Sequence, residues 1–305
     1  MLRGRPVSGT PPRVLLTAAA WMTGAIVSFT SMAVAGREVS FELSTFELMM
    51  YRSFIGIAIV LAVGGAAGTL GQISGARLGL HALRNASHFT GQNLWFYAIG
   101  AIPLAQVFAF EFTSPIWVAL AAPLILGERL TTVRVGAAVM GFLGILIVAR
   151  PTVDGISEGQ IAAAAAAIGF AGSAIFTKLL TRTETITCIL FWLAVMQAAM
   201  GVAFSLWFGP VTWPSAQNWP WLGLIGCAGL VAHFCITKAL TIAPATLVIP
   251  MDFLRLPVIA AVGMALYGET LDVWVLVGAG VIFAANYLNL WVESRPRRHR
   301  FMAKE

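Results

Sequence analysis

Charged residues are scarce in this chain. Of its 305 residues only 10% are charged, whereas 59% are hydrophobic, and the mean hydropathy is +0.85. A soluble domain of this length needs far more polar surface to stay dispersed. The composition therefore excludes a soluble globular protein and indicates an integral membrane protein.

Cysteine and the motifs of soluble enzymes are also scarce. The three cysteines, Cys188, Cys227 and Cys235, all fall within apolar stretches and show no metal-ligand spacing. The sequence has no Walker-type glycine loop, no GxGxxG after a strand and no paired-histidine zinc motif. We therefore predict no cofactor, no metal and no catalytic residue. Among membrane transport proteins, the absence of a nucleotide-binding motif favours a secondary carrier over an ATP-driven pump.

Long apolar stretches occupy almost the whole chain. Crossing the hydrocarbon layer takes about 20 mostly apolar residues per helix. Ten such stretches begin near Val14, Thr45, Gly79, Leu104, Thr132, Gly159, Thr185, Trp219, Ala245 and Leu271. We expect an all-α integral membrane protein with ten transmembrane helices and no soluble domain.

The basic residues fall mainly on one side of the expected membrane. With the N-terminus in the cytoplasm, the opposite side holds only Arg37 and Arg150. The cytoplasmic side holds Arg3, Arg5, Arg13, Arg77, Arg129, Arg134, Lys178, Arg182, Lys238, Arg295, Arg297, Arg298, Arg300 and Lys304. This asymmetry predicts that both termini are cytoplasmic. We interpret the basic tail, residues 293–305, mainly as a topology signal that is suited to contact with anionic lipid; nucleic-acid binding is the weaker interpretation.

An internal duplication relates the two halves of the chain. Residues 103–130 reappear as residues 244–271 at a constant offset of 141, which places Phe112 on Phe253 and Glu111 on Asp252. Five helices per repeat is an odd number, so the second repeat must enter the membrane from the opposite side. We predict two inverted five-helix repeats, residues 14–150 and 158–292, as in many secondary transporters.

The third apolar stretch carries an unusual polar stripe. His81, Asn85, His88, Gln92 and Trp95 follow 4, 3, 4 and 3 spacing, which aligns them on one helical face. Lipid cannot accommodate such a face, so it must look into protein or water. We expect it to line a solute cavity; a hydrogen-bond network that joins helices is the alternative.

Two acidic residues form a symmetric pair inside the apolar stretches. Glu111 and Asp252 each precede a proline, Pro115 and Pro257, which tends to open a helix locally. A carboxyl in such dry surroundings holds a proton more tightly and can serve a proton-coupled carrier. The alternative is neutralisation by an arginine. Arg255 lies one turn from Asp252, and Arg84 reaches Glu111 if the third and fourth helices are neighbours.

Four further residues complete the candidate site. Arg52 lies inside the second stretch, toward its cytoplasmic half, where snorkelling to the interface competes with a role in the cavity. His233 occupies the repeat position of Gln92, which favours a shared wall. Trp21 and Trp117 lie at depth and, with Trp95, are candidates for stacking on a flat ring, although packing is the alternative.

The chain resembles the EamA type of the drug/metabolite transporter superfamily over residues 14–292. The resemblance rests on the Arg52 helix, the start of the third helix at Leu83 and Arg84, and paired segments in both halves. These segments are 98–103, 112–115, 127–130 and 141–151 in the first half, and 239–244 and 268–271 in the second. The resemblance implies a bacterial inner-membrane carrier that moves small organic metabolites through a central cavity by alternating access. Residues 111–117 and 252–257 are similar to the branch that takes up riboflavin or S-adenosylmethionine.

The favoured hypothesis is uptake of riboflavin or a similar heteroaromatic solute. Asn85, His88 and Gln92 would hydrogen-bond the solute, and Glu111 or Asp252 would carry a coupled proton. Arg84 and Arg255 would serve as counter-charges. The alternatives are S-adenosylmethionine uptake, export of amino acids or drugs, a membrane enzyme that acts on lipid through His81 or His88, and a structural subunit with a dry, packed centre.

Overall fold

The computed structural model describes residues 12–126, 131–150, 155–243, 248 and 251–294. Within these ranges the chain is all-α and contains no β-strand, as the sequence predicts. The helices are α1 (Pro12–Val39), α2 (Thr45–Ala66), the short 3-10 helix η1 (Leu70–Gln72), α3 (Leu78–Ala101), α4 (Leu104–Glu111), α5 (Ser114–Leu126), α6 (Thr132–Ala149), α7 (Glu158–Leu180), α8 (Ile186–Phe208), α9 (Trp219–Ile242), α11 (Arg255–Tyr267) and α12 (Val273–Ser294).

Several expected features lie outside the described residues. They include the loop of residues 127–130, the linker of residues 151–154 and the start of the second repeated segment, residues 244–247. Helix α12 continues to Ser294, so the first two residues of the expected tail, 293–305, belong to a helix. The remainder of that tail lies outside the described residues.

Eight apolar segments in the described part of the chain are long enough to cross a membrane. Helices α4 and α5 count together as one of them, over Leu104–Ala122. Of the ten expected stretches, α3 has sufficient length, but its polar stripe lowers its hydropathy. Helix α11 is apolar and only 13 residues long. Length and hydropathy alone therefore support eight spans.

The fourth expected stretch is broken between α4 and α5. Pro115 has no N–H to donate to the carbonyl of Glu111, which ends the regular hydrogen bonding of α4. At the break the hydroxyl of Thr113 donates to the carbonyl of Phe110 at 2.7 Å, and Asn286 Nδ2 donates to the carbonyl of Phe112 at 2.7 Å. Because these carbonyls are satisfied inside the protein, the helix can open at membrane depth. This confirms the expected local opening at Glu111.

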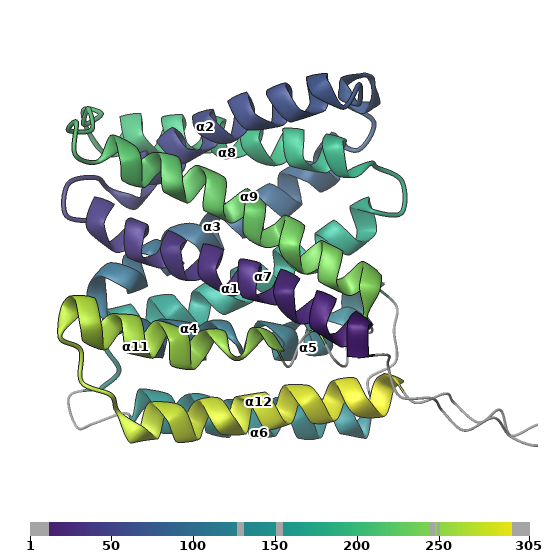
Figure 1. Ribbon diagram of the computed structural model, residues 1–305, viewed down its shortest axis with the longest axis vertical. Helices are drawn as coiled ribbons and strands as arrows, with labels where there is room; N and C mark the ends of the chain where they lie inside the picture. The colour runs from purple at the N-terminus through teal and green to yellow at the C-terminus, as the bar shows by residue number, and fades with distance from the viewer. Residues whose placement is uncertain (1–11, 127–130, 151–154, 244–247, 249–250, 295–305) are drawn as a thin grey trace, which may run out of the picture.

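The helices pack in pairs that combine the two halves of the chain. The most extensive contacts join α1 to α9, α3 to α7, α6 to α12 and α2 to α8, and α4 contacts α11. The α6–α12 pair and the α2–α8 pair lie at opposite ends of the bundle, with the other helices between them (Figure 1). The start of α1 and the end of α12 lie on the same side.

Large apolar side chains cover the outside of the bundle. Leu124 is 89% exposed, Trp207 is 83% exposed and Phe208 is 69% exposed. Water would oppose such a surface, whereas a hydrocarbon layer accommodates it. The polar stripe of α3 is buried, as are Arg84 and Arg255. The bundle is therefore apolar outside and polar in part of its interior.

Candidate functional site

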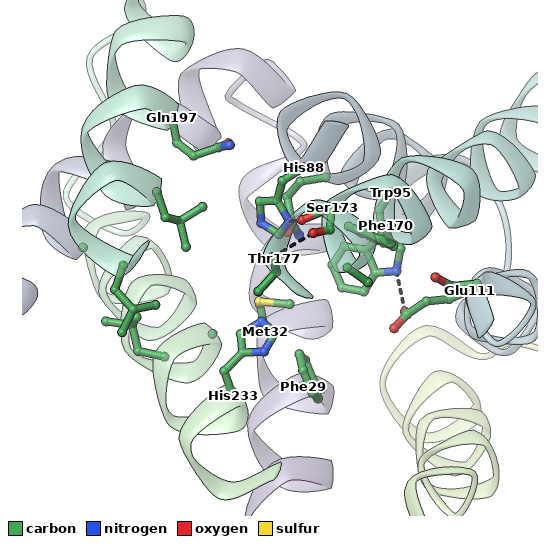
Figure 2. A pocket seen from close by; sticks show the side chains of 18 of the residues that line it. Phe29, Met32, His88, Trp95, Glu111, Phe170, Ser173, Thr177, Gln197 and His233 are labelled. Carbon is green, nitrogen blue, oxygen red and sulfur yellow. Dashed lines mark hydrogen bonds between the residues drawn. The ribbon is translucent and has the colours of Figure 1, made fainter. Parts of the chain in front are cut away.

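A cavity of about 560 Å³ lies in the interior of the bundle (Figure 2). Its walls come from the middle of α1, α2, α3, α7, α8 and α9, and from the chain around the α4–α5 break and the start of α11. The lining is mostly apolar. Its polar and charged members are Arg52, Ser53, Arg84, His88, Gln92, Trp95, Glu111, Ser114, Ser173, Thr177, Gln197, His233, Asp252 and Arg255.

Four phenylalanines of the lining occupy two pairs of repeat-equivalent positions. Phe29 and Phe170 are related by the 141-residue offset, and so are Phe112 and Phe253. The rings of Phe112 and Phe253 stack with centroids 4.4 Å apart, which joins the two repeated segments. None of the four was among the expected site residues. The duplication itself was the signal that marked them, because each pair keeps the same residue at equivalent positions.

The polar stripe of α3 divides into two parts. His88, Gln92 and Trp95 line the cavity. Asn85 is fully buried outside the lining, where its Nδ2 donates to the carbonyl of His81 and to that of Trp192 in α8. The half of the stripe with Asn85 thus joins helices, which was the alternative expectation, and the other half faces the cavity.

One guanidinium contacts both interior carboxylates, which are partly buried. Arg255 Nη2 lies 3.1 Å from Glu111 Oε1 and 3.1 Å from Asp252 Oδ2. Glu111 also accepts a hydrogen bond of 2.8 Å from Trp95 Nε1, which Figure 2 shows. Both carboxylates are therefore paired with an arginine, as the alternative to proton carriage expects, but a single guanidinium faces the two of them.

Arg84 does not reach Glu111. Its Nε donates to the hydroxyl of Thr177 in α7 at 3.1 Å, and its Nη1 contacts Asn85 Oδ1 at 3.3 Å. The expectation failed because the arginine side chain turns toward α7, the main packing partner of α3. Arg84 remains a cationic member of the cavity wall.

Arg52 lines the cavity and does not snorkel. It follows the start of α2 at Thr45 by seven residues, so it lies in the first third of that helix. With the N-terminus in the cytoplasm this is the outer half of the membrane, and the cytoplasmic placement expected above was wrong. Its guanidinium lies 6.0 Å from the ring centroid of Phe96, and its buried Nη1 has no hydrogen-bond partner among the described residues.

Of the three remaining expected residues, one lines the cavity and two lie outside its lining. His233 lines the cavity and meets Phe29 edge to face, with centroids 5.6 Å apart. Trp21 packs edge to face on Phe234 instead, and Trp117 is half-buried; neither is among the lining residues.

Three lining residues carried no distinctive sequence signal: Ser173 and Thr177 in α7, and Gln197 in α8. They are isolated polar residues in apolar helices, and only packing brings them beside α3. Ser173 Oγ lies 3.5 Å from His88 Nδ1, and Gln197 Nε2 donates to the carbonyl of Asn85 at 3.0 Å.

Polar contacts close the face of the bundle where α1 ends and α2 begins, which we call the Arg37 face. Arg37 donates to the carbonyls of Ile99 at 2.7 Å and Ile102 at 2.6 Å, and it forms an ion pair with Glu269. Glu269 also accepts from the backbone N–H of Leu104 at 3.0 Å. Three separate helices, α1, α3 and α4, are thereby tied to the loop before α12.

Comparison with known proteins gives a consistent result. The model of the EamA-like transporter family matches residues 16–150 and again 157–291. A riboflavin transporter of Brucella anthropi is 33% identical over 215 residues, which cover 69% of this chain and 76% of that protein. An S-adenosylmethionine uptake transporter of Rickettsia bellii is 24% identical, with coverage of 90% and 94%.

A solved crystal structure shares the fold. It superposes with a TM-score of 0.61 at 19% sequence identity and covers 91% of this chain and 97% of its own. The paired family matches, the apolar exterior and the interior cavity agree with a multi-pass membrane transporter of small metabolites. This chain belongs to the EamA-like transporter family.

Proposed function

We propose that this protein takes up riboflavin or a similar flat heteroaromatic solute across the bacterial inner membrane. Proteins named riboflavin transporter are 33% and 31% identical to it, which favours this solute class. The cavity of about 560 Å³ lies within the range of roughly 300–1,000 Å³ that small-molecule sites occupy. The aromatic walls are the observation that carries the proposal, since they suit a flat ring.

The proposed architecture is ten spans in two inverted five-helix repeats, with both termini in the cytoplasm. Moving each span to its equivalent five spans later converts the α1–α9 contact into the α7–α3 contact. The α2–α8, α6–α12 and α4–α11 contacts convert into themselves. This pairing supports a two-fold relation between the halves, an arrangement that many alternating-access carriers share. Charge asymmetry favours the cytoplasmic termini.

The charge of the cavity favours riboflavin over S-adenosylmethionine. Its described lining has three arginines, Arg52, Arg84 and Arg255, against two acids, Glu111 and Asp252. Riboflavin is neutral near neutral pH, whereas S-adenosylmethionine carries a net positive charge that an excess of arginine repels. Like-charge repulsion is stronger where water is excluded. The cavity is therefore expected to discriminate against S-adenosylmethionine by its charge.

Unpaired donors in the cavity wall match the acceptors of a flavin-type ring. Arg52 Nη1 and Arg255 Nε and Nη1 are buried and have no hydrogen-bond partner among the described residues. A bound solute with carbonyl oxygens and ring nitrogens would satisfy them, which reduces the cost of their burial. His88, Gln92 and His233 add polar contacts, and Trp95 adds an aromatic edge. We assign no solute contact to Asn85, Trp21 or Trp117.

A proton is a secondary candidate as coupling partner. Glu111 and Asp252 share one guanidinium, so the cluster of three groups carries one net negative charge before solute enters. Uptake of one proton would neutralise it. A proton gradient would then accelerate riboflavin entry, and Asp252→Asn would abolish that acceleration while slower downhill flux persists.

Flux measurements in proteoliposomes test the proposal. We expect saturable entry of labelled riboflavin that Gln92→Ala reduces at least about tenfold and that labelled S-adenosylmethionine does not match. Cys227→Ser, which changes an exposed thiol, is the matched control. Equal riboflavin flux with and without protein would overturn the proposal. Flux of S-adenosylmethionine alone would select that solute, and lipid turnover lost in His88→Ala without any solute flux would indicate the membrane enzyme.

A further inference from the structure

Three potential metal ligands meet on the face opposite the Arg37 face, where α3 and α8 begin. They are His81 of α3, Glu184 of the turn before α8 and Cys188 of the first turn of α8. One ligand atom from each lies within 4.8 Å of the others. We propose that these residues bind a Zn²⁺-like transition-metal ion, at a site separate from the solute cavity. None of the three lines that cavity.

The side chains are held in a setting that a metal ion would complete. His81 and Cys188 are both 0% exposed, and His81 Nε2 lies 4.0 Å from Cys188 Sγ. Zn–N and Zn–S bonds of about 2.05 and 2.3 Å at a tetrahedral angle place N and S roughly 3.6 Å apart. A shift of a few tenths of an ångström therefore converts this contact into shared coordination.

The imidazole also lacks part of its hydrogen bonding. His81 Nδ1 is buried without a partner among the described residues, and its other nitrogen has only the long contact to sulfur. A buried histidine with so little satisfied polarity costs free energy, which a metal bond at either nitrogen would offset. Packing alone would not require that both groups beside His81, the carboxylate of Glu184 and the thiol of Cys188, be potential metal ligands.

The ligand set selects the class of ion. Thiolate and imidazole prefer Zn²⁺ and similar borderline or soft ions, whereas Mg²⁺ and Ca²⁺ prefer oxygen. Cys188 now contacts the backbone carbonyl of Ser74 at 3.4 Å. On binding, the thiol proton passes to water, sulfur bonds the metal, and a water molecule fills the fourth position. Glu184 is half-buried, so it offers an entry path from the membrane surface.

Metal binding at this position would hold α3 against α8. Both helices line the solute cavity, α3 through His88 and α8 through Gln197. Alternating access requires the helices around the cavity to move relative to one another. A bound ion is therefore expected to slow solute flux reversibly, and a chelator is expected to restore it. The binding claim itself is independent of which solute the protein carries.

Cobalt spectroscopy on the purified full-length protein tests the site without any transport assay. We expect one equivalent of Co²⁺ to give a thiolate-to-metal charge-transfer band and tetrahedral visible bands, both displaced by Zn²⁺. Cys188→Ser should abolish the charge-transfer band, and Glu184→Gln should weaken binding at least about tenfold. Cys227→Ser, an exposed thiol elsewhere, should change neither.

Two results would overturn the site. One is the absence of a thiolate band in the wild-type protein; the other is an unchanged band in Cys188→Ser. The wild-type measurement holds even when a variant of the buried cysteine does not fold. Glu184→Gln, at a half-buried turn, is expected to fold and to keep its metal-free riboflavin flux, but to lose Zn²⁺ inhibition. Flux without Zn²⁺ sensitivity would remove only the inhibitory role.

Discussion

Arg255 contacts both acidic and aromatic side chains around the cavity. Beyond its two carboxylates, its guanidinium lies 4.5 Å from the ring centroid of Phe29, 5.0 Å from that of Phe108 and 5.1 Å from that of Phe112. Its side chain is 4% exposed, so water does not replace these partners. The repeat-equivalent residue, Ser114, is uncharged. The cavity is thus asymmetric in charge although its framework is duplicated.

Removal of this guanidinium should be costly. We expect Arg255→Ala to lower the free energy of unfolding by about 2–4 kcal/mol, because two partly buried carboxylates lose their counter-charge. Thermal unfolding of the detergent-solubilised protein measures this. Arg255→Lys keeps the charge and should recover part of the loss, and adding Glu111→Gln to Arg255→Ala should recover more. An unchanged unfolding temperature in Arg255→Ala would contradict the assignment.

Glu42, in the loop between α1 and α2, gives a prediction on pH. The Ser215 hydroxyl donates to it at 2.7 Å and the Ser215 backbone N–H at 2.6 Å, and Asn218 donates a further hydrogen bond. These bonds favour the carboxylate and lower the pKa of Glu42 below its ordinary value of 4.5. The folded protein therefore binds this proton less readily than the unfolded chain, and the stabilisation is present above that ordinary value.

Acid should remove this stabilisation. As the pH falls through the lowered pKa of folded Glu42, its contribution disappears. We expect Glu42→Gln to lower the unfolding temperature at pH 7, and we expect the difference from the wild type to shrink steadily as the pH falls below the ordinary value of 4.5. Unfolding curves at a series of pH values test this. A difference that stays constant from pH 7 to pH 3 would show that the carboxylate charge is not responsible.

Glycine sets the distance between α3 and α7. A Cβ added at Gly169 would lie 2.7 Å from Gly91 Cα and 2.9 Å from the carbonyl of Ser87, both backbone atoms that cannot turn aside. Small residues allow such close approach of membrane helices. This contact places Ser173 beside His88 and Thr177 beside Arg84, so it also sets the geometry of the cavity wall.

Gly169→Ala should separate these helices. We expect a loss of about 1–3 kcal/mol in the free energy of unfolding through overpacking, together with reduced solute flux. Gly136→Ala is the matched control, since a Cβ at Gly136 in α6 meets nothing within 4 Å. That change should be neutral or should stabilise by about 0.5–1 kcal/mol, because alanine favours a helix. Equal effects at the two positions would argue against close packing at Gly169.

At the scale of the whole molecule, polar contacts between helices close the bundle on the Arg37 face. The proposed topology puts this face on the periplasmic side of the inner membrane. Its ion pair, Arg37 with Glu269, is nearly buried, with side chains 10% and 13% exposed. On the same face the pair of Arg150 with Asp272 is much more accessible, with 50% and 25% exposed. Exposed pairs contribute little, roughly 0–1 kcal/mol, so the two arginines should differ in effect.

Loss of the Arg37 pair should open the cavity outward. In a variant with the three cysteines replaced by serine and Ser173→Cys added, a membrane-impermeant thiol reagent on the periplasmic side reports access to the cavity. We expect Arg37→Ala to raise the labelling rate at least about fivefold, corresponding to roughly 1 kcal/mol or more of lost closure. Arg150→Ala should leave the rate within about twofold. Equal rates in both variants would remove Arg37 as a determinant of closure.

The sequence alone determined the membrane character, the position of most helices and the duplication. It also marked His88, Gln92, Trp95, Glu111 and Asp252 as interior polar residues. These properties are local or repeat at fixed spacing, so composition and periodicity carry them.

Only the tertiary structure decided that Arg255 and not Arg84 neutralises Glu111, and that Asn85 joins helices while His88 faces the cavity. It also brought His81 within reach of Cys188, 107 residues away. Which distant helices meet depends on how the whole bundle packs, because side-chain partners across helices have no fixed separation along the chain.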